Sequence, residues 1–237
     1  MKKAYFSVAN KILLALFAIV GILINLINAE ADGYSSAASR LLYFTNLSNV
    51  FVLAVSVLFL VFEIKSLRGN KDLRGKRLYL VKLASTVSIT LTAVIFCAVL
   101  APGASNVDYN AWTFGSIIVH TVVPFFAIVD FFIDGGDFAF EKKHSLLSLA
   151  PPLSYFIFCV VLYLLNVDFG RGDNFPYFFL NFGSPAGIFG FSEEFPYRIG
   201  SFYWVVFISA LVYSTSILYS FLHNLKIKKK DKKNAGF

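Results

Sequence analysis

The sequence predicts an all-α membrane protein, a bundle of six transmembrane helices with both termini in the cytoplasm and a long aromatic outer loop between helices five and six. Of its 237 residues, 57% are hydrophobic and only 15% are charged, whereas about a quarter of a soluble domain is charged. Six continuously apolar stretches are long enough to cross a hydrocarbon core, which takes about 20 helical residues. Helices are expected because they satisfy every backbone polar group within lipid.

The six predicted spans lie near residues 8–28, 41–62, 79–100, 114–133, 146–165 and 202–222. The first span begins like a signal peptide, and Ala29-Glu30-Ala31 resembles a cleavage site. Its uncharged stretch is long for the apolar region of a signal peptide. We therefore expect a retained first helix.

Lysines and arginines are concentrated on one side of the predicted bundle, and this asymmetry sets its orientation in the membrane. One side carries Lys2, Lys3, Lys11, the six cations of residues 65–77, Lys142, Lys143 and the six lysines of residues 226–233. The other side carries only Arg40, Arg171 and Arg198. We expect a transmembrane domain over residues 1–225 and a basic cytoplasmic tail over residues 226–237. Because the net charge of +7 is placed beside apolar segments, it does not indicate nucleic-acid binding.

The cysteines and the outer loop carry less information about chemistry. Cys97 and Cys159 both fall in apolar stretches, and we expect them to be small core residues. No ligand spacing predicts a metal ion, and no motif predicts a cofactor. The outer loop, residues 166–201, is rich in aromatic residues, which suits either an interfacial belt or a lid over a lipid-accessible cavity.

Thr45 and His120 are the polar residues within the spans that suggest a catalytic site. Thr45 lies about 6 Å into the second span and His120 about 9 Å into the fourth, both counted from the outer side. Ser48 and Asn49 share the face of Thr45, whereas Asn46 is turned away, and Ser116 shares the face of His120. Five hydroxyl residues of the third span are expected to serve helix packing instead: Ser85, Thr86, Ser88, Thr90 and Thr92.

An ionisable residue inside a span is a functional-site hypothesis by default. Burial favours the neutral imidazole, the form that a general base needs. A threonine beside it can attack an ester carbonyl, with Asn49, Ser48 or Asn25 as oxyanion donors and Ser116 as a supporting polar group. A structural histidine bonded to a hydroxyl remains the alternative. Pro124, one turn below His120, is expected to kink the helix and leave room for a pocket.

Four short motifs carry a resemblance to a known family. They are residues 42–49 (LYFTNLSN), 120–124 (HTVVP), 152–155 (PLSY) and 175–179 (FPYFF). Together they resemble bacterial six-helix membrane proteins of unassigned activity, a group distantly similar to the eukaryotic androgen-induced family of transmembrane threonine hydrolases. Those enzymes cleave fatty acid esters of hydroxy fatty acids. The resemblance implies Thr45 as the nucleophile and His120 as its partner.

The sequence therefore predicts an intramembrane lipid ester hydrolase or acyltransferase of the bacterial plasma membrane, acting on a lipid or fatty-acyl ester. Two alternatives remain open. One is a small transporter or channel with a path through Ser88, Thr92, His120 and Asp130. The other is a non-catalytic binding or scaffold protein whose polar groups serve helix packing. The sequence indicates neither the substrate nor the oligomeric state.

Overall fold

The computed structural model describes residues 2–103 and 111–234. Six helical segments within these ranges are long and apolar enough to cross a membrane, which confirms the predicted fold class and indicates an integral membrane protein. The described residues form no strand, only one antiparallel bridge between Phe191 and Ile199. Most of the loop after the third span and the last three residues of the predicted tail lie outside the described residues.

Each predicted span corresponds to a helical segment, although several of the segments are composite. The spans are α1 (Lys2–Ile27), α3 (Phe44–Leu67), α4 (Lys76–Ile95) with the π-helical turn η1 (Phe96–Leu100), α6 (Phe114–Ile117) with the π-helical turn η3 (Ile118–Val122) and α7 (Val123–Ile133), the 3-10 helix η4 (Lys142–Leu149) with α8 (Ala150–Leu164), and α9 (Ser201–Asn234). The short helices are α2 (Ala37–Arg40), α5 (Ala101–Gly103) and η5 (Phe178–Leu180). Because α9 continues past the predicted span, residues 226–234 are helical.

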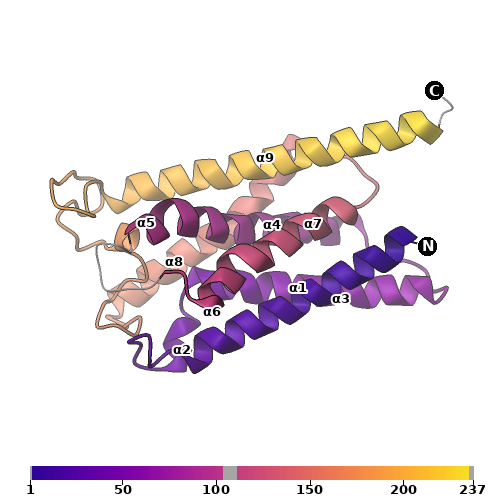
Figure 1. The fold of residues 1–237 in the computed structure, drawn as a ribbon. Helices are drawn as coiled ribbons and strands as arrows, with labels where there is room; N and C mark the ends of the chain where they lie inside the picture. Colours follow the sequence, from indigo (N-terminus) through magenta and orange to yellow (C-terminus); the bar gives the residue numbers. More distant parts are fainter. Residues whose placement is uncertain (1, 104–110, 235–237) are drawn as a thin grey trace.

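Helix α4 lies at the centre of the bundle. About 67% of its most apolar stretch is buried, against 22% for the span formed by α9. It packs against α3, α7 and α9, and α9 lies along the side of the bundle opposite α1 and α3 (Figure 1). Both termini lie at one end of the bundle, here called the basic end, and the chain between α8 and α9 lies at the other, here called the loop end (Figure 1).

The hydroxyl residues of α4 serve packing, as expected. Their hydroxyls donate to carbonyls three or four residues earlier in the same helix, in the pairs Ser85 to Lys82, Thr86 to Lys82, Ser88 to Ala84, Thr90 to Thr86 and Thr92 to Ser88. Small side chains whose polar groups are satisfied within their own helix let neighbouring helices approach closely. The sequence of α4 therefore suits a helix that is surrounded by others.

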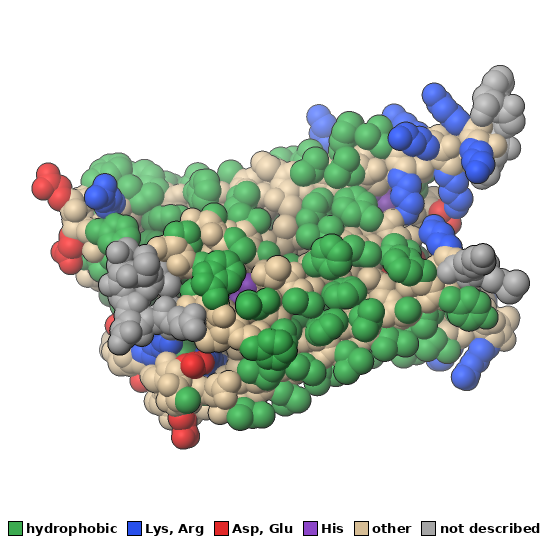
Figure 2. Space-filling model, viewed as in Figure 1, with side chains coloured by type: hydrophobic (Ala, Val, Ile, Leu, Met, Phe, Trp, Pro, Cys, Tyr) green, Lys and Arg blue, Asp and Glu red, His purple; other side chains and the backbone are tan. Residues whose placement is uncertain are grey.

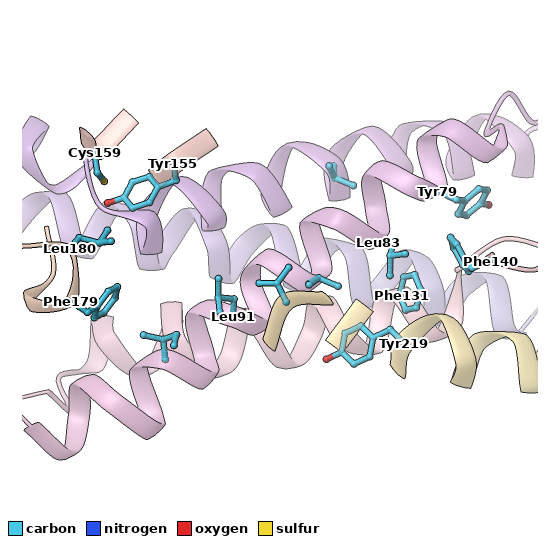
Figure 3. Packing of buried hydrophobic residues seen from close by; sticks show 14 of the residues in the cluster. Tyr79, Leu83, Leu91, Phe131, Phe140, Tyr155, Cys159, Phe179, Leu180 and Tyr219 are labelled. Carbon is cyan, nitrogen blue, oxygen red and sulfur yellow. The ribbon is translucent and has the colours of Figure 1, made fainter. Parts of the chain in front are cut away.

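A core of aromatic and aliphatic side chains extends along the bundle, from Tyr79 and Phe140 near the basic end to Tyr155 and Phe179 near the loop end (Figure 3). Cys159 is buried in this core, as predicted. The same prediction for Cys97 is wrong, because its side chain is exposed. Cys97 follows Phe96 in the π-helical turn η1, where Phe96 takes the buried position.

The surface is divided along the length of the bundle. Hydrophobic side chains cover the middle, and lysines and arginines gather at the basic end (Figure 2). The sequence predicts this distribution, because its lysines and arginines are concentrated in the segments on one side of the bundle. By the same rule, the basic end is expected to face the cytoplasm.

A cluster of buried ion pairs lies inside the bundle near the basic end. The Nζ atom of Lys11, whose side chain is fully buried, lies 2.8 Å from Glu63 Oε2, 2.9 Å from Asp130 Oδ1 and 2.9 Å from Asp134 Oδ2. Lys82 Nζ lies 2.7 Å from Asp130 Oδ2, and Arg74 Nη1 lies 2.9 Å from Asp134 Oδ2. From the sequence, Lys11 is expected only to help orient the protein in the membrane. In the structure its charge also joins α1 to α3 and α7.

Two opposing effects act on the pKa of Asp134, which follows the end of α7. Burial alone would raise the pKa of the Asp134 carboxyl. The cations of Lys82, Lys11 and Arg74 outweigh burial and hold this pKa below its ordinary range. Stabilisation from this carboxylate is therefore present above the pKa of the unfolded chain and is lost as pH falls through the lower, folded value.

We predict that Lys11→Met destabilises the protein by about 3 kcal/mol, because it leaves buried carboxylates without their shared cation. The measurement is thermal unfolding in detergent micelles. Lys230→Met is the matched control, since Lys230 pairs with Asp137 on an exposed surface and its loss should leave the unfolding temperature unchanged. Equal unfolding temperatures for the two variants would show that the cluster does not stabilise the bundle.

Candidate active site

The structure brings Thr45 and His120 together at the loop end. Thr45 lies in the first turn of α3, and His120 lies in the π-helical turn of the fourth span. Thr45 Oγ1 and His120 Nε2 are 3.3 Å apart, within the distance expected of a nucleophile and its base before substrate binds. The contact joins two residues that the sequence places at similar depths.

The contacts of the second ring nitrogen of His120 indicate which group donates the hydrogen bond between Thr45 and His120. His120 Nδ1 lies 2.9 Å from the carbonyl oxygen of Ser116 and 3.1 Å from its hydroxyl. A carbonyl oxygen can only accept a hydrogen bond, so Nδ1 carries the hydrogen of the neutral imidazole. Nε2 is then the basic nitrogen, and it faces Thr45. Ser116 therefore orients the imidazole, and its supporting role in catalysis stays a prediction.

A stacked aromatic ring holds the imidazole plane. Phe96, the first residue of η1, lies parallel to His120 with ring centroids 3.8 Å apart and planes 11° apart. Both residues lie in π-helical turns, which insert one extra residue into a helix and occur often at functional sites. The two irregular turns thus place one ring against the other.

Pro124 explains why the fourth span departs from regular geometry. Proline has no backbone N–H, so it cannot bond to the carbonyl of His120 four residues earlier. In the turn that precedes it, the Val123 N–H bonds instead to the carbonyl of Ile118, five residues back. The expected distortion at Pro124 therefore takes the form of a π-helical turn that contains His120.

Two glycines set the close approach of α1 to the fourth span. A Cβ atom on Gly21 would lie 2.7 Å from side-chain atoms of Ile118 and Val119. A Cβ atom on Gly115 would lie 2.7 Å from Ile24 and 3.1 Å from Asn25 Oδ1. Larger residues at either position would force the helices apart. Glycine thus keeps the π-helical turn against α1.

The proposed oxyanion donors bond to other acceptors in this structure. Asn49 Nδ2 donates to the carbonyls of Thr45, at 2.7 Å, and Val119, at 3.3 Å. Ser48 Oγ lies 3.0 Å from the Thr45 carbonyl and 2.7 Å from Thr92 Oγ1. These contacts brace the backbone on either side of the site. Their catalytic roles stay predictions.

Asn25 and Asn46 form a second brace. Asn25 Nδ2 donates to Asn46 Oδ1 at 3.3 Å, and Asn46 Nδ2 donates to the carbonyl of Arg40 at 2.8 Å. Asn46 is turned away from the face of Thr45, as predicted, and is nevertheless 2% exposed. The reason is that α1 and the segment before α3 cover that side of the helix, which periodicity within one helix does not show.

Tyr177 is the neighbour of Thr45 that the sequence does not identify. Its hydroxyl oxygen accepts a hydrogen bond from the Thr45 backbone N–H at 3.4 Å. Burial raises the pKa of the Tyr177 hydroxyl, so the group stays protonated and keeps a hydrogen to donate. The signal in the sequence is slight: one hydroxyl within the otherwise apolar run 175–179.

Thr45 lies on the border of two cavities. A cavity of about 1150 Å³ at the loop end is bounded, among the described residues, by Thr45, His120, Tyr177 and several charged side chains. A smaller cavity of about 70 Å³ lies between α4, α8 and α9, and its walls are mostly apolar. Thr45 thus lies between a cavity with charged side chains in its wall and a smaller, almost wholly apolar one.

Within residues 2–103 and 111–234, no group of three or more His, Cys, Asp and Glu side chains is placed to hold a metal ion. Comparison with models of known families, with curated proteins and with solved structures found no match to this chain. The chemistry of the site is therefore argued from its own geometry.

We predict that His120 carries its hydrogen on Nδ1, because the Ser116 carbonyl is available only as an acceptor. The measurement is the ¹⁵N chemical shifts of the imidazole in detergent-solubilised protein at neutral pH, assigned by comparison with His120→Gln. Thr45→Val should leave this tautomer unchanged, since Ser116 fixes it. A hydrogen on Nε2 in the unaltered protein would contradict the assignment of the base.

Proposed function

We propose that the protein is a threonine-type lipid ester hydrolase or acyltransferase of the bacterial plasma membrane, with Thr45 as nucleophile and His120 as base. The observation that carries this proposal is the 3.3 Å contact between Thr45 Oγ1 and a ring nitrogen whose partner nitrogen is bonded to a carbonyl. A hydroxyl is a weak nucleophile at its free pKa, and an oriented neutral imidazole is what activates it. The backbone carbonyl of Ser116 takes the orienting role that a carboxylate has in serine hydrolases.

The reaction proceeds in two halves. Thr45 Oγ1 attacks the ester carbonyl carbon while its proton passes to His120 Nε2, and the carbonyl becomes an oxyanion. Collapse of this intermediate breaks the bond to the alcohol, which leaves with the proton from Nε2 and produces acyl-threonine. Water, or a second alcohol, then attacks with its proton passing to Nε2. Collapse of this second intermediate releases the acid or the new ester, and the proton returns from Nε2 to Thr45.

Tyr177 is the best-placed donor to the developing oxyanion. Its oxygen is already within hydrogen-bond distance of the Thr45 backbone N–H, and its O–H group remains a donor. An oxyanion formed at Thr45 would lie beside this hydroxyl. Preorganised donors of this kind are among the largest contributions to catalysis by hydrolases.

The two cavities match the two parts of a lipid ester. The smaller cavity, lined by apolar residues such as Leu91, Ile95 and Phe156, suits the start of an acyl chain. Leu153 of α8 both borders this cavity and is exposed on the surface of the bundle, so a chain can enter from the side. The larger cavity suits the polar part of the substrate.

The motifs at residues 42–49 and 120–124 add to this proposal. They resemble the corresponding motifs of bacterial six-helix membrane proteins and, distantly, of the androgen-induced family of threonine hydrolases. The transport alternative has less support, because Ser88 and Thr92 bond to carbonyls of their own helix and Asp130 is paired with Lys11 and Lys82.

We predict that a fluorophosphonate probe labels the protein and that Thr45→Ala and His120→Ala each abolish labelling. The first variant removes the nucleophile and the second removes its base. Thr121→Ala is the matched control, since Thr121 adjoins His120 but is exposed, and it should be labelled normally. Labelling is read by gel fluorescence, and thermal unfolding verifies that each variant is folded. Unchanged labelling of either active-site variant would exclude the assignment, leaving a non-catalytic role.

We predict that Tyr177→Phe lowers kcat by about 100-fold with little change in KM, because the lost donor acts in the transition state. The assay is hydrolysis of a medium-chain p-nitrophenyl ester in detergent micelles. Tyr197→Phe is the control, since Tyr197 borders the same large cavity without a hydrogen bond to Thr45 in the described structure. If both variants keep full activity, Tyr177 is not the oxyanion donor.

A further inference from the structure

The part of the outer loop that precedes α9 folds as a small hairpin, residues 190–200. Phe191 and Ile199 form its antiparallel bridge, and the Ser192 N–H bonds to the Arg198 carbonyl at 3.1 Å. The hairpin extends beyond the start of α9, at the loop end of the bundle (Figure 1). It therefore lies outside the span that α9 forms.

Backbone contacts attach this part of the loop closely to the first turn of α9. The Phe202 N–H bonds to the Ile188 carbonyl at 3.0 Å, and the Tyr203 hydroxyl donates to the Phe189 carbonyl at 3.1 Å. The first N–H groups of a helix have no acceptor within the helix, so the loop supplies one. A Cβ atom on Gly200 would collide with the Ile188 carbonyl oxygen, so glycine permits this close approach.

Five large apolar side chains around the start of α9 form one exposed surface, here called the outer apolar patch: Ile188, Phe189, Phe191, Phe202 and Tyr203. The ring centroids of Phe189 and Phe202 are 5.2 Å apart, and those of Phe191 and Tyr203 are 5.1 Å apart. Phe191 is 71% exposed. Of the described residues that border the two cavities, none belongs to this patch. The patch is therefore not part of the wall of the candidate active site.

The outer apolar patch continues the exposed apolar surface of α9. Val206 and Phe207 are exposed, and they lie four residues after Phe202 and Tyr203, on the same face of the helix. Because α9 is long and apolar enough to cross a membrane, this exposed face contacts lipid acyl chains. The patch thus begins where the lipid-facing surface of the span ends.

Two opposing requirements set the depth of the hairpin in the membrane. Aromatic side chains are favoured at the boundary between hydrocarbon and water. The tip of the hairpin carries Glu193 and Glu194, both exposed, and charged groups are costly in hydrocarbon. Irregular backbone that faces lipid is also excluded from the hydrocarbon region. The level of the lipid head groups satisfies both requirements.

We propose that residues 188–203 form an interfacial anchor, in which the outer apolar patch inserts among the lipids of the leaflet at the loop end. The partner is the bilayer that surrounds the bundle, and the tip of the hairpin stays in water. The outer loop is then divided in its contacts, because residues 175–179 border the two cavities and residues 188–203 contact lipid. This inference does not depend on catalysis by Thr45.

The test measures the depth of single tryptophans in a Trp112→Phe, Trp204→Phe background. Phe191→Trp reports from the outer apolar patch, Glu193→Trp from the tip two residues away, and Phe207→Trp from the exposed face of α9. Each protein is reconstituted in phosphatidylcholine nanodiscs, which leave both faces open to solvent. The quenchers are iodide in water and phosphatidylcholine brominated either near the head group or near the chain end.

We predict that iodide quenches the fluorescence of Glu193→Trp at least about three-fold more strongly than that of Phe191→Trp or Phe207→Trp, because lipid covers the patch and the span. Lipid brominated near the head group should quench Phe191→Trp more than lipid brominated near the chain end. In Phe207→Trp, quenching should shift toward the lipid brominated near the chain end.

The anchor and its depth can each be contradicted. Equal iodide quenching of Phe191→Trp and Glu193→Trp, without quenching of Phe191→Trp by brominated lipid, would overturn the anchor. Strongest quenching of Phe191→Trp by lipid brominated near the chain end would overturn its head-group depth. Thermal unfolding verifies each fold, and Phe189→Trp reports from the same patch if Phe191→Trp does not fold. Because these variants leave Thr45 and His120 unaltered, failure of the anchor is distinct from failure of fluorophosphonate labelling.

Discussion

A hydrocarbon medium supplies no hydrogen-bond partners, so every polar group of the bundle must find its partner within the chain. The hydroxyls of α4 meet this constraint by bonding to carbonyls of their own helix. The amide nitrogen of Asn49 meets it by bridging the carbonyls of Thr45 and Val119, and Lys11 meets it with three carboxylates. Thr45 differs from all of these, because its partner is a basic nitrogen and its hydroxyl group borders open space.

The same constraint explains why the site is built from irregular helix. Pro124 lacks the N–H that would bond to the His120 carbonyl, and a π-helical turn accommodates this loss with one extra residue. Pro124 fixes the position of the turn, and Gly21 and Gly115 let α1 pack against it. A few residues, each unfavourable in an ordinary helix, thus act together to direct His120 toward Thr45.

The features of this arrangement that depend on local sequence pattern could be predicted from the sequence. Apolar length predicts the six spans, and depth from the outer end of each helix predicts that Thr45 and His120 lie in the same layer of the membrane. Contacts between residues from distant segments of the chain could not be predicted in this way. Neither the pairing of Lys11 with Glu63 nor the contact of Tyr177 with Thr45 follows from any period or spacing, because both depend on how separate helices and a loop pack. The exposure of Cys97 and the burial of Asn46 against Asn25 were not foreseen for the same reason.

The charged groups at the two ends of the bundle lie in different settings. Near the basic end, Glu63, Asp130 and Asp134 pair with Lys11, Lys82 and Arg74 at 2.7–2.9 Å, and Arg74 also pairs with Asp72. These groups lie between helices, where their pairing joins one helix to the next. At the loop end, Arg40 pairs with the Asp32 carboxylate and Arg171 donates to the Asp32 backbone carbonyl, and both arginines line the large cavity that Thr45 and His120 also line. Charge is therefore enclosed by packing at one end and borders a cavity at the other, which is the end where Thr45 and His120 meet.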